Sequence, residues 1–384
     1  MWGIVSVLCL SLIVYTYLVY PAAVITIARR KKARNCAASL QMNKLPTVSF
    51  IVSVYNEEKS IEGKVINTLQ INYPPELIEF IFVSDGSTDR TNEILEQYIE
   101  KGVQVYCLPN RVGKTKAQEF AIERARGEVL VFSDASTQLE PESVRCLVQR
   151  LQDPTVGLVS GEDEWLLTSE HRASVGQGLY VRYEMAIRKS ESEISTATAS
   201  SGCFYAVRRE LRPLLSATLI DDFATPLAVI EKGFRVVTET QAKCYVPMTS
   251  SERREFSRKV RIVAGGVYAL WIYRRLLNPF RYGIVAWQLW SHKVLRWAVP
   301  FVAIVMLLSS VVWATVSVWG KGLVLVELLF GISALMGWQV KGKSKLHTML
   351  RAAFFLVMSN YAVLLGVIHC MLHGSPATWE PSRR

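Results

Sequence analysis

The sequence lacks several short motifs that mark common catalytic sites. It has no H-E-x-x-H pair, and its five histidines do not cluster as a zinc site. It has no G-x-S-x-G elbow. Gly113-Lys114-Thr115 resembles the end of a phosphate-binding loop, but the earlier glycine of such a loop would have to stand at Leu108. These absences argue against a zinc protease, an α/β-hydrolase and a P-loop NTPase.

Paired cysteines and basic recognition helices are also missing. None of the seven cysteines belongs to a C-x-x-C pair, and Cys107, Cys203 and Cys244 fall in apolar, strand-like runs. We expect these three to be reduced thiols in a core, which suits a cytoplasmic segment. The net charge is +11, but no basic helix carries interleaved base-reading residues. We therefore expect no nucleic-acid partner and assign the excess charge to contact with anionic lipid.

Long apolar runs, in contrast, are abundant. Half of the 384 residues are apolar, and the mean hydropathy is +0.21. A bilayer crossing needs about 20 apolar residues. Four runs meet or approach that length, the third being shorter and containing Glu327: Trp2 to Ala28, Trp297 to Gly320, Gly322 to Val340 and Ala352 to Leu372. The first run has no preceding positive charge and is followed by a basic run, so we predict an anchor and not a cleaved signal peptide.

Two basic segments orient these predicted spans. Arg29 to Arg34 and Lys341 to Lys345 mark the cytoplasmic side. Four spans satisfy both marks, which predicts a multi-pass protein of the cell membrane with a cytoplasmic catalytic domain. The predicted organisation is an anchor at 1–28, a basic juxtamembrane linker at 29–46, a catalytic domain at 47–255, interfacial amphipathic helices at 256–296, three transmembrane helices at 297–372 and a tail at 373–384.

The segment after the linker alternates between strands and helices. We predict strands at 47–55, 78–84, 103–108 and 128–133, and helices at 60–69, 88–101 and 114–126. This alternation indicates βαβ units and an α/β fold with a mostly parallel sheet. Past Pro141 the pattern is looser, with a helix expected at 175–190, a strand at 200–207 and a helix at 223–232.

Polar side chains follow three of the predicted strands. Tyr55-Asn56-Glu57 ends the first, Asp85 and Ser87 follow the second, and Asp134 and Ser136 follow the fourth. Ligands bind at this edge of an open α/β sheet. Asp85 could accept hydrogen bonds from a nucleobase or ribose, and Asp134 with Ser136 could bind Mg²⁺ or Mn²⁺. Taken singly, each aspartate is also compatible with an ordinary turn.

Two further charged groups lie later in the chain. Asp221-Asp222 stands at a predicted helix start, where adjacent acids either stabilise the helix or raise one pKa into the range of a general base. Arg258-Lys259-Val260-Arg261 is a basic patch that could contact lipid headgroups or stabilise a diphosphate leaving group.

Taken in order, these residues resemble the membrane-integrated family 2 glycosyltransferases of GT-A fold, over roughly residues 47 to 265 and the flanking spans. The resemblance implies that Tyr55, Asn56, Glu57 and Asp85 hold the nucleotide and that Lys114 approaches it. It places Asp134-Ala135-Ser136 at the family's D-x-D metal site, Ser201-Gly202 beside the sugar, and Asp222 as the base.

The chain also departs from the family pattern. Ser136 replaces the second acid of D-x-D. Arg258 to Ile262 matches the Q-x-x-R-W segment of the processive synthases, so Arg261 keeps the diphosphate contact, but Ile262 replaces the tryptophan that stacks on the acceptor. We therefore expect one or a few sugar transfers.

The resemblance implies an inverting transfer from a nucleoside-diphosphate sugar, with a UDP-sugar favoured. The acceptor stays open between a growing polysaccharide and a lipid-linked sugar or polyprenyl phosphate, the latter including a GDP-mannose-dependent transfer. A transporter with a regulatory nucleotide-binding domain is the alternative from another class, with Glu327 and His369 as its intramembrane polar groups.

Overall fold

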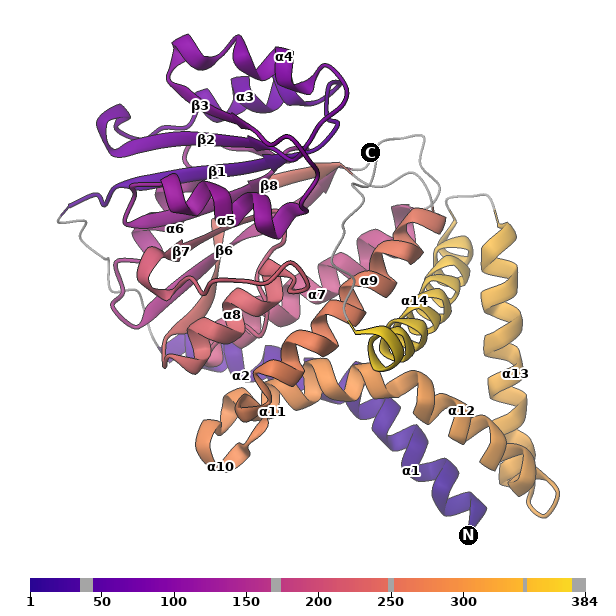
Figure 1. Ribbon diagram of the computed structural model, residues 1–384. Helices are drawn as coiled ribbons and strands as arrows, with labels where there is room; N and C mark the ends of the chain where they lie inside the picture. The colour runs from indigo at the N-terminus through magenta and orange to yellow at the C-terminus, as the bar shows by residue number, and fades with distance from the viewer. Residues whose placement is uncertain (35–43, 167–173, 248–251, 341–343, 375–384) are drawn as a thin grey trace.

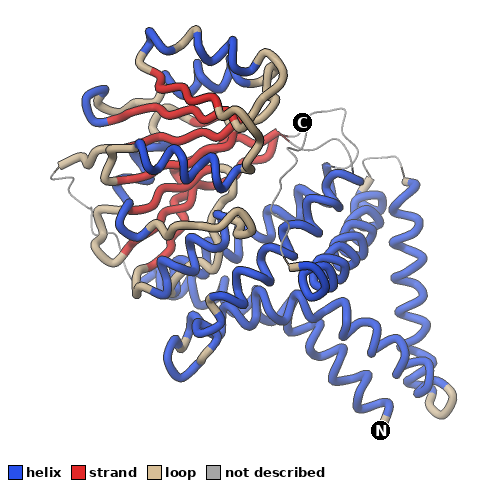
Figure 2. The backbone as a smooth tube through the Cα atoms, in the orientation of Figure 1, coloured by secondary structure: helices blue, strands red, loops and turns tan. Residues whose placement is uncertain are grey.

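The computed structural model describes residues 1–34, 44–166, 174–247, 252–340 and 344–374. A sheet domain occupies one side of the molecule and a group of long helices the other (Figure 1). Among the described residues, all of the strands lie in the sheet domain, whereas the other side consists of helices and their connecting loops (Figure 2).

One eight-stranded sheet organises the α/β domain, in the order β3-β2-β1-β4-β7-β6-β8-β5. Strands β1 (Val48–Val54), β2 (Ile78–Ser84), β3 (Val103–Cys107) and β4 (Val129–Asp134) pair in parallel. Strand β7 (Phe204–Arg208) runs antiparallel between β4 and β6 (Val156–Leu166). Strand β8 (Arg235–Pro247) is parallel to β6, and the short β5 (Gln138–Leu139) closes the edge. The parallel half gives the predicted strand ends a common edge.

Alternate residues of the strands separate two apolar cores. Phe50 and Val52 of β1 face one core, with helices α3 (Ile61–Leu69), α4 (Thr91–Glu96) and α6 (Ser143–Arg150). Ile51 faces the other core, with helices α5 (Lys114–Arg124) and α8 (Asp221–Glu231) and part of α9 (Glu252–Ile272). A sheet covered on both faces requires strands that are largely apolar, and β1 is apolar except for Ser49 and Ser53.

The structure confirms the predicted parallel α/β core and corrects several details. The predicted helix 88–101 is shorter, because α4 ends at Glu96 and only a 3₁₀ turn, Ile99–Lys101, follows. Strands β6 and β8 were missed, since Glu162, Asp163 and Glu164 interrupt the apolar pattern of β6. Cys203 and Cys244 are buried as predicted, but Cys107 is exposed on the edge strand β3.

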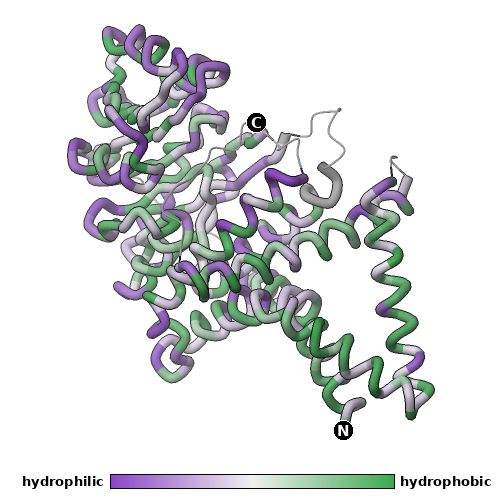
Figure 3. Tube along the Cα trace, turned by 45° about the vertical axis from the view of Figure 1, so that its right-hand side comes forward, coloured by the Kyte–Doolittle hydropathy of each residue, from purple (hydrophilic) through white to green (hydrophobic). Residues whose placement is uncertain are grey.

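Among the residues that the structure describes, four helical segments are long and apolar enough to cross a membrane. They are Trp2–Lys31 (α1, Trp2–Val14; η1, Tyr15–Val19; α2, Tyr20–Arg34), Ile284–Ala314 (α11, Ile284–Leu289; η6, Trp290–Val294; α12, Leu295–Ala314), Val318–Gln339 (α13) and Lys345–His373 (α14). Apolar residues dominate the helices that project away from the sheet domain (Figure 3). The second segment begins at Ile284, inside the region predicted as interfacial, so its helix is longer than the sequence pattern indicated.

Two helices connect the sheet domain to these segments. Helix α7 (Ser174–Ile194) packs on α2 and α14, and α9 packs on α8 and α14. In Figure 1 both helices lie between the sheet and the apolar helices. The strand edge and the membrane-type helices therefore meet through α7 and α9.

Candidate active site

The carboxyl ends of β1 and β2 are held together by a turn that depends on Asn56 and Gly86. The Asn56 backbone N–H donates to Ser87 Oγ at 3.1 Å, and Asn56 Oδ1 accepts from the Thr88 N–H at 2.8 Å. Gly86 has a φ of +66°, and a Cβ there would lie 2.6 Å from the backbone nitrogen of Arg111. Glycine is required at this position because both the backbone angle and the space exclude a side chain.

Tyr55 and Glu57 flank this turn. The Arg111 guanidinium lies 4.1 Å from the centroid of the Tyr55 ring, and such a pair is a flat surface of the kind on which aromatic groups stack. The Glu57 backbone N–H donates to Thr91 Oγ1 at 2.9 Å, and its side chain accepts from Ser60 Oγ. The predicted nucleotide contacts of these residues remain predictions.

Asp85 holds the loop that leads into α5. Its carboxylate is 3% exposed, with Oδ1 accepting from the Val112 N–H at 2.7 Å and Oδ2 from the Gly113 N–H at 2.9 Å. Each oxygen keeps a second lone pair, so a nucleobase contact is chemically compatible with these bonds. The structure thus adds a scaffolding role that the sequence pattern did not indicate.

Lys114 is the cation at the centre of the strand edge. Its Nζ lies 2.9 Å from Asp134 Oδ1 and 3.8 Å from Asp221 Oδ2, and it donates to the Gly202 carbonyl oxygen at 3.2 Å. Burial alone would lower the pKa of Lys114, but the charges of Asp134 and Asp221 outweigh it and raise that pKa. Lys114 therefore stays charged and gathers three segments of the predicted site.

The donor set at Asp134 and Ser136 fits a divalent cation that arrives with a substrate. Asp134 ends β4 with its side chain 24% exposed, and Ser136 follows two residues later. Within the described ranges, no group of three His, Cys, Asp or Glu side chains could hold an ion alone. Mg²⁺ and Mn²⁺ sites often combine one or two protein oxygens with substrate phosphates, which matches this arrangement.

The adjacent carboxylates of Asp221 and Asp222 have different surroundings. Asp221 is 4% exposed, and its Oδ2 accepts from Gln118 Nε2 at 3.0 Å and Tyr205 Oη at 3.3 Å. Asp222 is half-buried, and burial together with the negative charge of Asp221 raises its pKa to about 6. Asp222 thus has the ionisation expected of a general base, while Asp221 is bonded into the scaffold.

Gly202 lies directly against Asp222, and the hydroxyl of its neighbour Ser201 forms hydrogen bonds within the protein. A Cβ on Gly202 would lie 2.5 Å from Asp222 Oδ2. Ser201 is fully buried; its Oγ donates to Asp163 and accepts from the Cys203 N–H at 3.0 Å. The family resemblance implies that both residues lie beside the sugar, which stays a prediction, and the hydrogen bonds of Ser201 hold this loop in place.

Arg258 and Arg261, the two arginines predicted to contact the diphosphate, differ in their surroundings. Arg258 forms two 2.9 Å hydrogen bonds to Glu255, which raise its pKa although burial acts to lower it. Burial and the nearby Arg258 lower the pKa of Arg261 to about 10, and the charges of Asp222 and Asp134 oppose that shift. The charge of Arg261, on α9, therefore interacts with two of the carboxylates that Lys114 also faces, Asp222 and Asp134.

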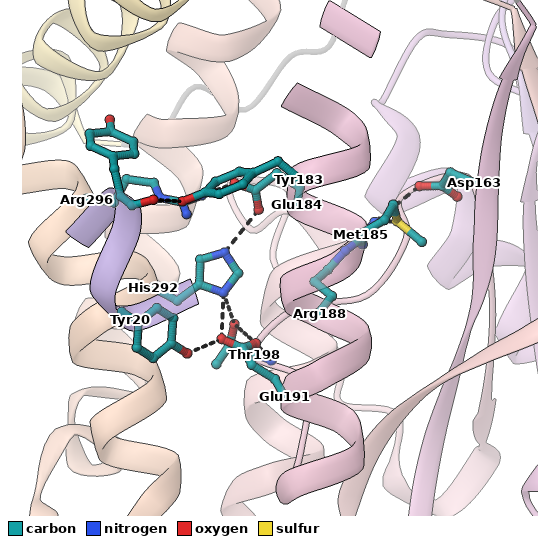
Figure 4. Close-up of polar contacts among 11 residues, drawn as sticks. Tyr20, Asp163, Tyr183, Glu184, Met185, Arg188, Glu191, Thr198, His292 and Arg296 are labelled. Carbon is teal, nitrogen blue, oxygen red and sulfur yellow. Dashed lines mark hydrogen bonds and ion pairs between the residues drawn. The ribbon is translucent and has the colours of Figure 1, made fainter. Parts of the chain in front are cut away.

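A buried polar cluster lies between α7 and the apolar helices (Figure 4). His292 contacts Glu191 at 2.7 Å and Glu184 at 3.0 Å, Tyr20 donates to Glu191, and Arg296 pairs with Glu184. Burial acts to raise the pKa of Glu191, but its bonds to His292 and Tyr20 hold it below the usual range. The first and second apolar segments are thus fastened to α7.

Helix α7 in turn contacts the segment that holds Ser201 and Gly202 through Asp163. Arg188 lies 3.4 Å from Asp163, the residue that accepts the hydrogen bond from Ser201 (Figure 4). A continuous chain of polar contacts therefore runs from α7 to the residue next to Gly202.

These polar contacts between α7 and Ser201 were not predicted from the sequence, and Lys64 was not singled out. Arg188, Asp163 and Lys64 stand outside any recognised motif. A signal for Lys64 existed, because it interrupts the stripe of α3 that buries Ile61, Val65 and Thr68. Burial lowers the pKa of Lys64 to about 7, with the charge of Asp134 opposing.

Comparisons with known proteins agree with this geometry. Residues 49–210 match glycosyl transferase family 2. An N-acetylglucosaminyltransferase of Rhizobium leguminosarum bv. trifolii is 31% identical over 150 residues, which are 36% of this chain and 82% of that protein. A poly-beta-1,6-N-acetyl-D-glucosamine synthase of Staphylococcus aureus is 22% identical over 238 residues, 60% of this chain. The match covers 57% of that synthase, little more than half of its length.

A solved structure resembles nearly the whole chain. It is a mannosyltransferase from Pyrobaculum calidifontis in complex with GDP-Man and Mn²⁺, with a TM-score of 0.70 and 20% sequence identity. The similarity covers 94% of this chain and 99% of that one, so it shows a shared fold that includes the apolar helices. These matches lead to one conclusion: the chain belongs to glycosyl transferase family 2 and is a glycosyltransferase of GT-A fold.

Proposed function

We propose that this protein is an inverting, membrane-integrated glycosyltransferase with a nucleoside-diphosphate sugar as donor. The acceptor is a hydroxyl of a saccharide or lipid-linked sugar at the membrane. The observation that carries the proposal is the half-buried carboxylate of Asp222, with a pKa of about 6, beside Gly202 and within the field of Lys114 and Asp134. A base with such a pKa is largely ionised at neutral pH and still takes up a proton in the transition state.

The mechanism is a single displacement at the anomeric carbon. As the acceptor oxygen attacks, Asp222 takes its proton, and the bond between the anomeric carbon and the diphosphate oxygen breaks. Lys114 and Arg261 supply fixed positive charge near the leaving diphosphate. Asp134 and Ser136 would hold a divalent cation, which would add charge stabilisation to the same group.

The donor is a UDP-sugar in this proposal, and the names of the relatives indicate which sugar donor should be tested first. Two relatives are named for N-acetylglucosamine, whereas the structural neighbour was solved with GDP-Man. The two relatives are similar to this chain in sequence over 238 and 150 residues, whereas the structural neighbour, at 20% identity, supports the fold alone. We therefore place UDP-N-acetylglucosamine first and GDP-mannose second.

The location of the catalytic domain is also a proposal. Four apolar helices and the basic segment that begins at Arg29 support a multi-pass protein of the cell membrane with the sheet domain in the cytoplasm. Labelling of single engineered cysteines, at positions in the sheet domain and at the ends of the apolar helices, tests this in sealed vesicles.

A donor panel tests the function. Purified protein in membrane mimic is incubated with UDP- and GDP-sugars, native lipid extract, and Mn²⁺, Mg²⁺ or EDTA, and nucleotide release is measured. Release with one donor, transfer of its label to a lipid-extractable or polymeric product, and loss of both in Asp222→Asn are the expected results. Absence of release with every donor, or full activity of the variant, would contradict the proposal.

A further inference from the structure

Lys64 is a basic residue in a place where the packing calls for an apolar one. Helix α3 packs on the sheet through Ile61, Lys64, Val65 and Thr68, all with 0% exposure. A buried ammonium group loses its hydration, so its position is unfavourable unless the surroundings replace the lost bonds. The contacts of its Nζ therefore indicate what this lysine does.

Both hydrogen bonds that Lys64 Nζ donates fall on the segment that carries the proposed cation ligands. Its Nζ donates to Ser133 Oγ at 2.7 Å and to the Thr137 carbonyl oxygen at 2.7 Å. These two residues stand immediately before and immediately after Asp134-Ala135-Ser136. One side chain thus connects the two ends of a three-residue loop.

Asp134 consequently lies between two lysines with different roles. Lys114 makes a direct ion pair with its carboxylate at 2.9 Å, on the edge where ligands bind. Lys64 acts from beneath, through neutral oxygens of the flanking residues. Because the loop has one acid where the family pattern has two, the direction of its oxygens matters more for cation affinity than in a site with two carboxylates.

We propose that Lys64 is a positioning residue for the cation-binding loop of residues 134–136. It holds the loop so that Asp134 and Ser136 point their oxygens toward a divalent cation carried by the donor diphosphate. The inference rests on the proposed function, because it requires that such a cation and diphosphate bind there. Lys64 itself touches neither.

A purely structural role for Lys64 would be to attach α3 to the sheet. The chain offers a matched comparison, because Asn67 on the same helix performs that task elsewhere. Its side chain accepts from the Leu139 N–H at 2.9 Å and donates to the Leu139 carbonyl at 2.9 Å, beyond the loop. Asn67→Ala therefore loosens the same helix and leaves the loop ends bonded to Lys64.

The experiment measures Mn²⁺ and nucleotide binding, independently of turnover. Calorimetry in membrane mimic determines the affinity for UDP, and separately GDP, with and without Mn²⁺, and Mn²⁺ spectroscopy counts the bound ion. In Lys64→Met we expect the Mn²⁺-dependent gain in UDP affinity to fall at least tenfold, with metal-free UDP binding unchanged. Asn67→Ala should lower the melting temperature and keep the Mn²⁺-dependent gain.

A second variant covers the case in which Lys64→Met does not fold. Ser133→Ala removes one of the two acceptors and should lower the Mn²⁺-dependent gain several-fold. The proposal is overturned if Lys64→Met folds and keeps the wild-type Mn²⁺-dependent gain in UDP affinity. If Lys64→Met does not fold, the same result with Ser133→Ala overturns it. It is equally overturned if Asn67→Ala loses as much as Lys64→Met.

The wild-type protein separates this inference from the proposed function. If the wild type shows no Mn²⁺-dependent binding of either nucleotide, the donor proposal fails and the role of Lys64 fails with it. If the wild type binds and the variants do not differ from it, only the role of Lys64 is lost.

Discussion

The Cα of Gly202 approaches the carboxylate of Asp222 so closely that a Cβ at residue 202 would lie 2.5 Å from Asp222 Oδ2. Gly202→Ala should therefore push the carboxylate out of position and lower kcat at least tenfold, because small displacements of a base reduce proton transfer strongly. Gly178→Ala on α7 is the control, since a Cβ there meets nothing within 4 Å. Steady-state kinetics on both variants provides the measurement. Equal kcat values for Gly202→Ala and Gly178→Ala would contradict the prediction.

Asp222→Asn should remove the proton acceptor without removing the donor site. General-base catalysis contributes about 10²–10⁴-fold, so transfer should fall within that range while UDP binding stays near the wild-type affinity. In the wild type, with the pKa of Asp222 raised to about 6, kcat/KM should fall as pH decreases through 6 and level off above 7. A flat profile between pH 5 and 8 would remove Asp222 from this role.

The same substitution should stabilise the fold at high pH. The folded pKa of about 6 exceeds the unfolded value of about 3.9, so ionised Asp222 destabilises the folded state, fully so above pH 6 and not below pH 4. Asp222→Asn should gain on the order of 1–2 kcal/mol at pH 8 and almost nothing at pH 4. Thermal unfolding in detergent at both pH values tests the sign. A larger gain at pH 4 would show that the pKa is not raised.

Lys114→Met should affect both binding and ionisation. It removes the cation that pairs with Asp134 and Asp221, and because the positive charge of Lys114 lowers the pKa of Asp222, its loss should raise that pKa further. We expect donor affinity to fall at least tenfold and the acidic limb of the pH profile to move upward. Lys116→Met, two residues away and exposed, is the matched control and should leave both quantities unchanged.

The buried cluster around Glu191 should dominate the attachment of α7 to the apolar helices. Glu191 has 0% exposure and bonds to Tyr20, Thr198 and His292. Glu191→Ala removes one partner of buried charged groups, which typically costs about 3–5 kcal/mol. The exposed Arg90–Glu93 pair provides the control, since Glu93→Ala should leave the melting temperature nearly unchanged. Equal melting temperatures would mean that the cluster contributes no net stability.

The parallel half of the fold was predictable from the sequence. Strand β2 was predicted at its observed bounds, Ile78–Ser84, because apolar runs between turn residues identify strands buried on both faces. The polar residues after β1, β2 and β4 were recognised for the same reason, since parallel strands present their carboxyl ends at one edge. Strands β6 and β8 pair with residues distant in the chain, and their polar positions hid the pattern.

The candidate site was predicted in part. Asp134, Asp222 and Lys114 are brought together as the family resemblance implied, with Lys114 2.9 Å from Asp134. The hydrogen bonds from Ser201 to Asp163 and from Arg258 to Glu255 could not be predicted from the sequence, because each depends on which side chain the fold places next to the donor. The type of a residue indicates which interactions its side chain can form, and the neighbouring side chain in the fold determines which of them it forms.

The sequence by itself determined the α/β class, the apolar helices and the order of the carboxylates, since hydrophobic periodicity and local turn chemistry are written along the chain. The tertiary structure decided which of two adjacent aspartates has a raised pKa, which lysine lies beneath the loop of Asp134, and how α7 links the apolar helices to Gly202. These properties depend on burial and on contacts between residues far apart in the sequence. Desolvation and charge act through space, and a linear pattern does not contain those distances.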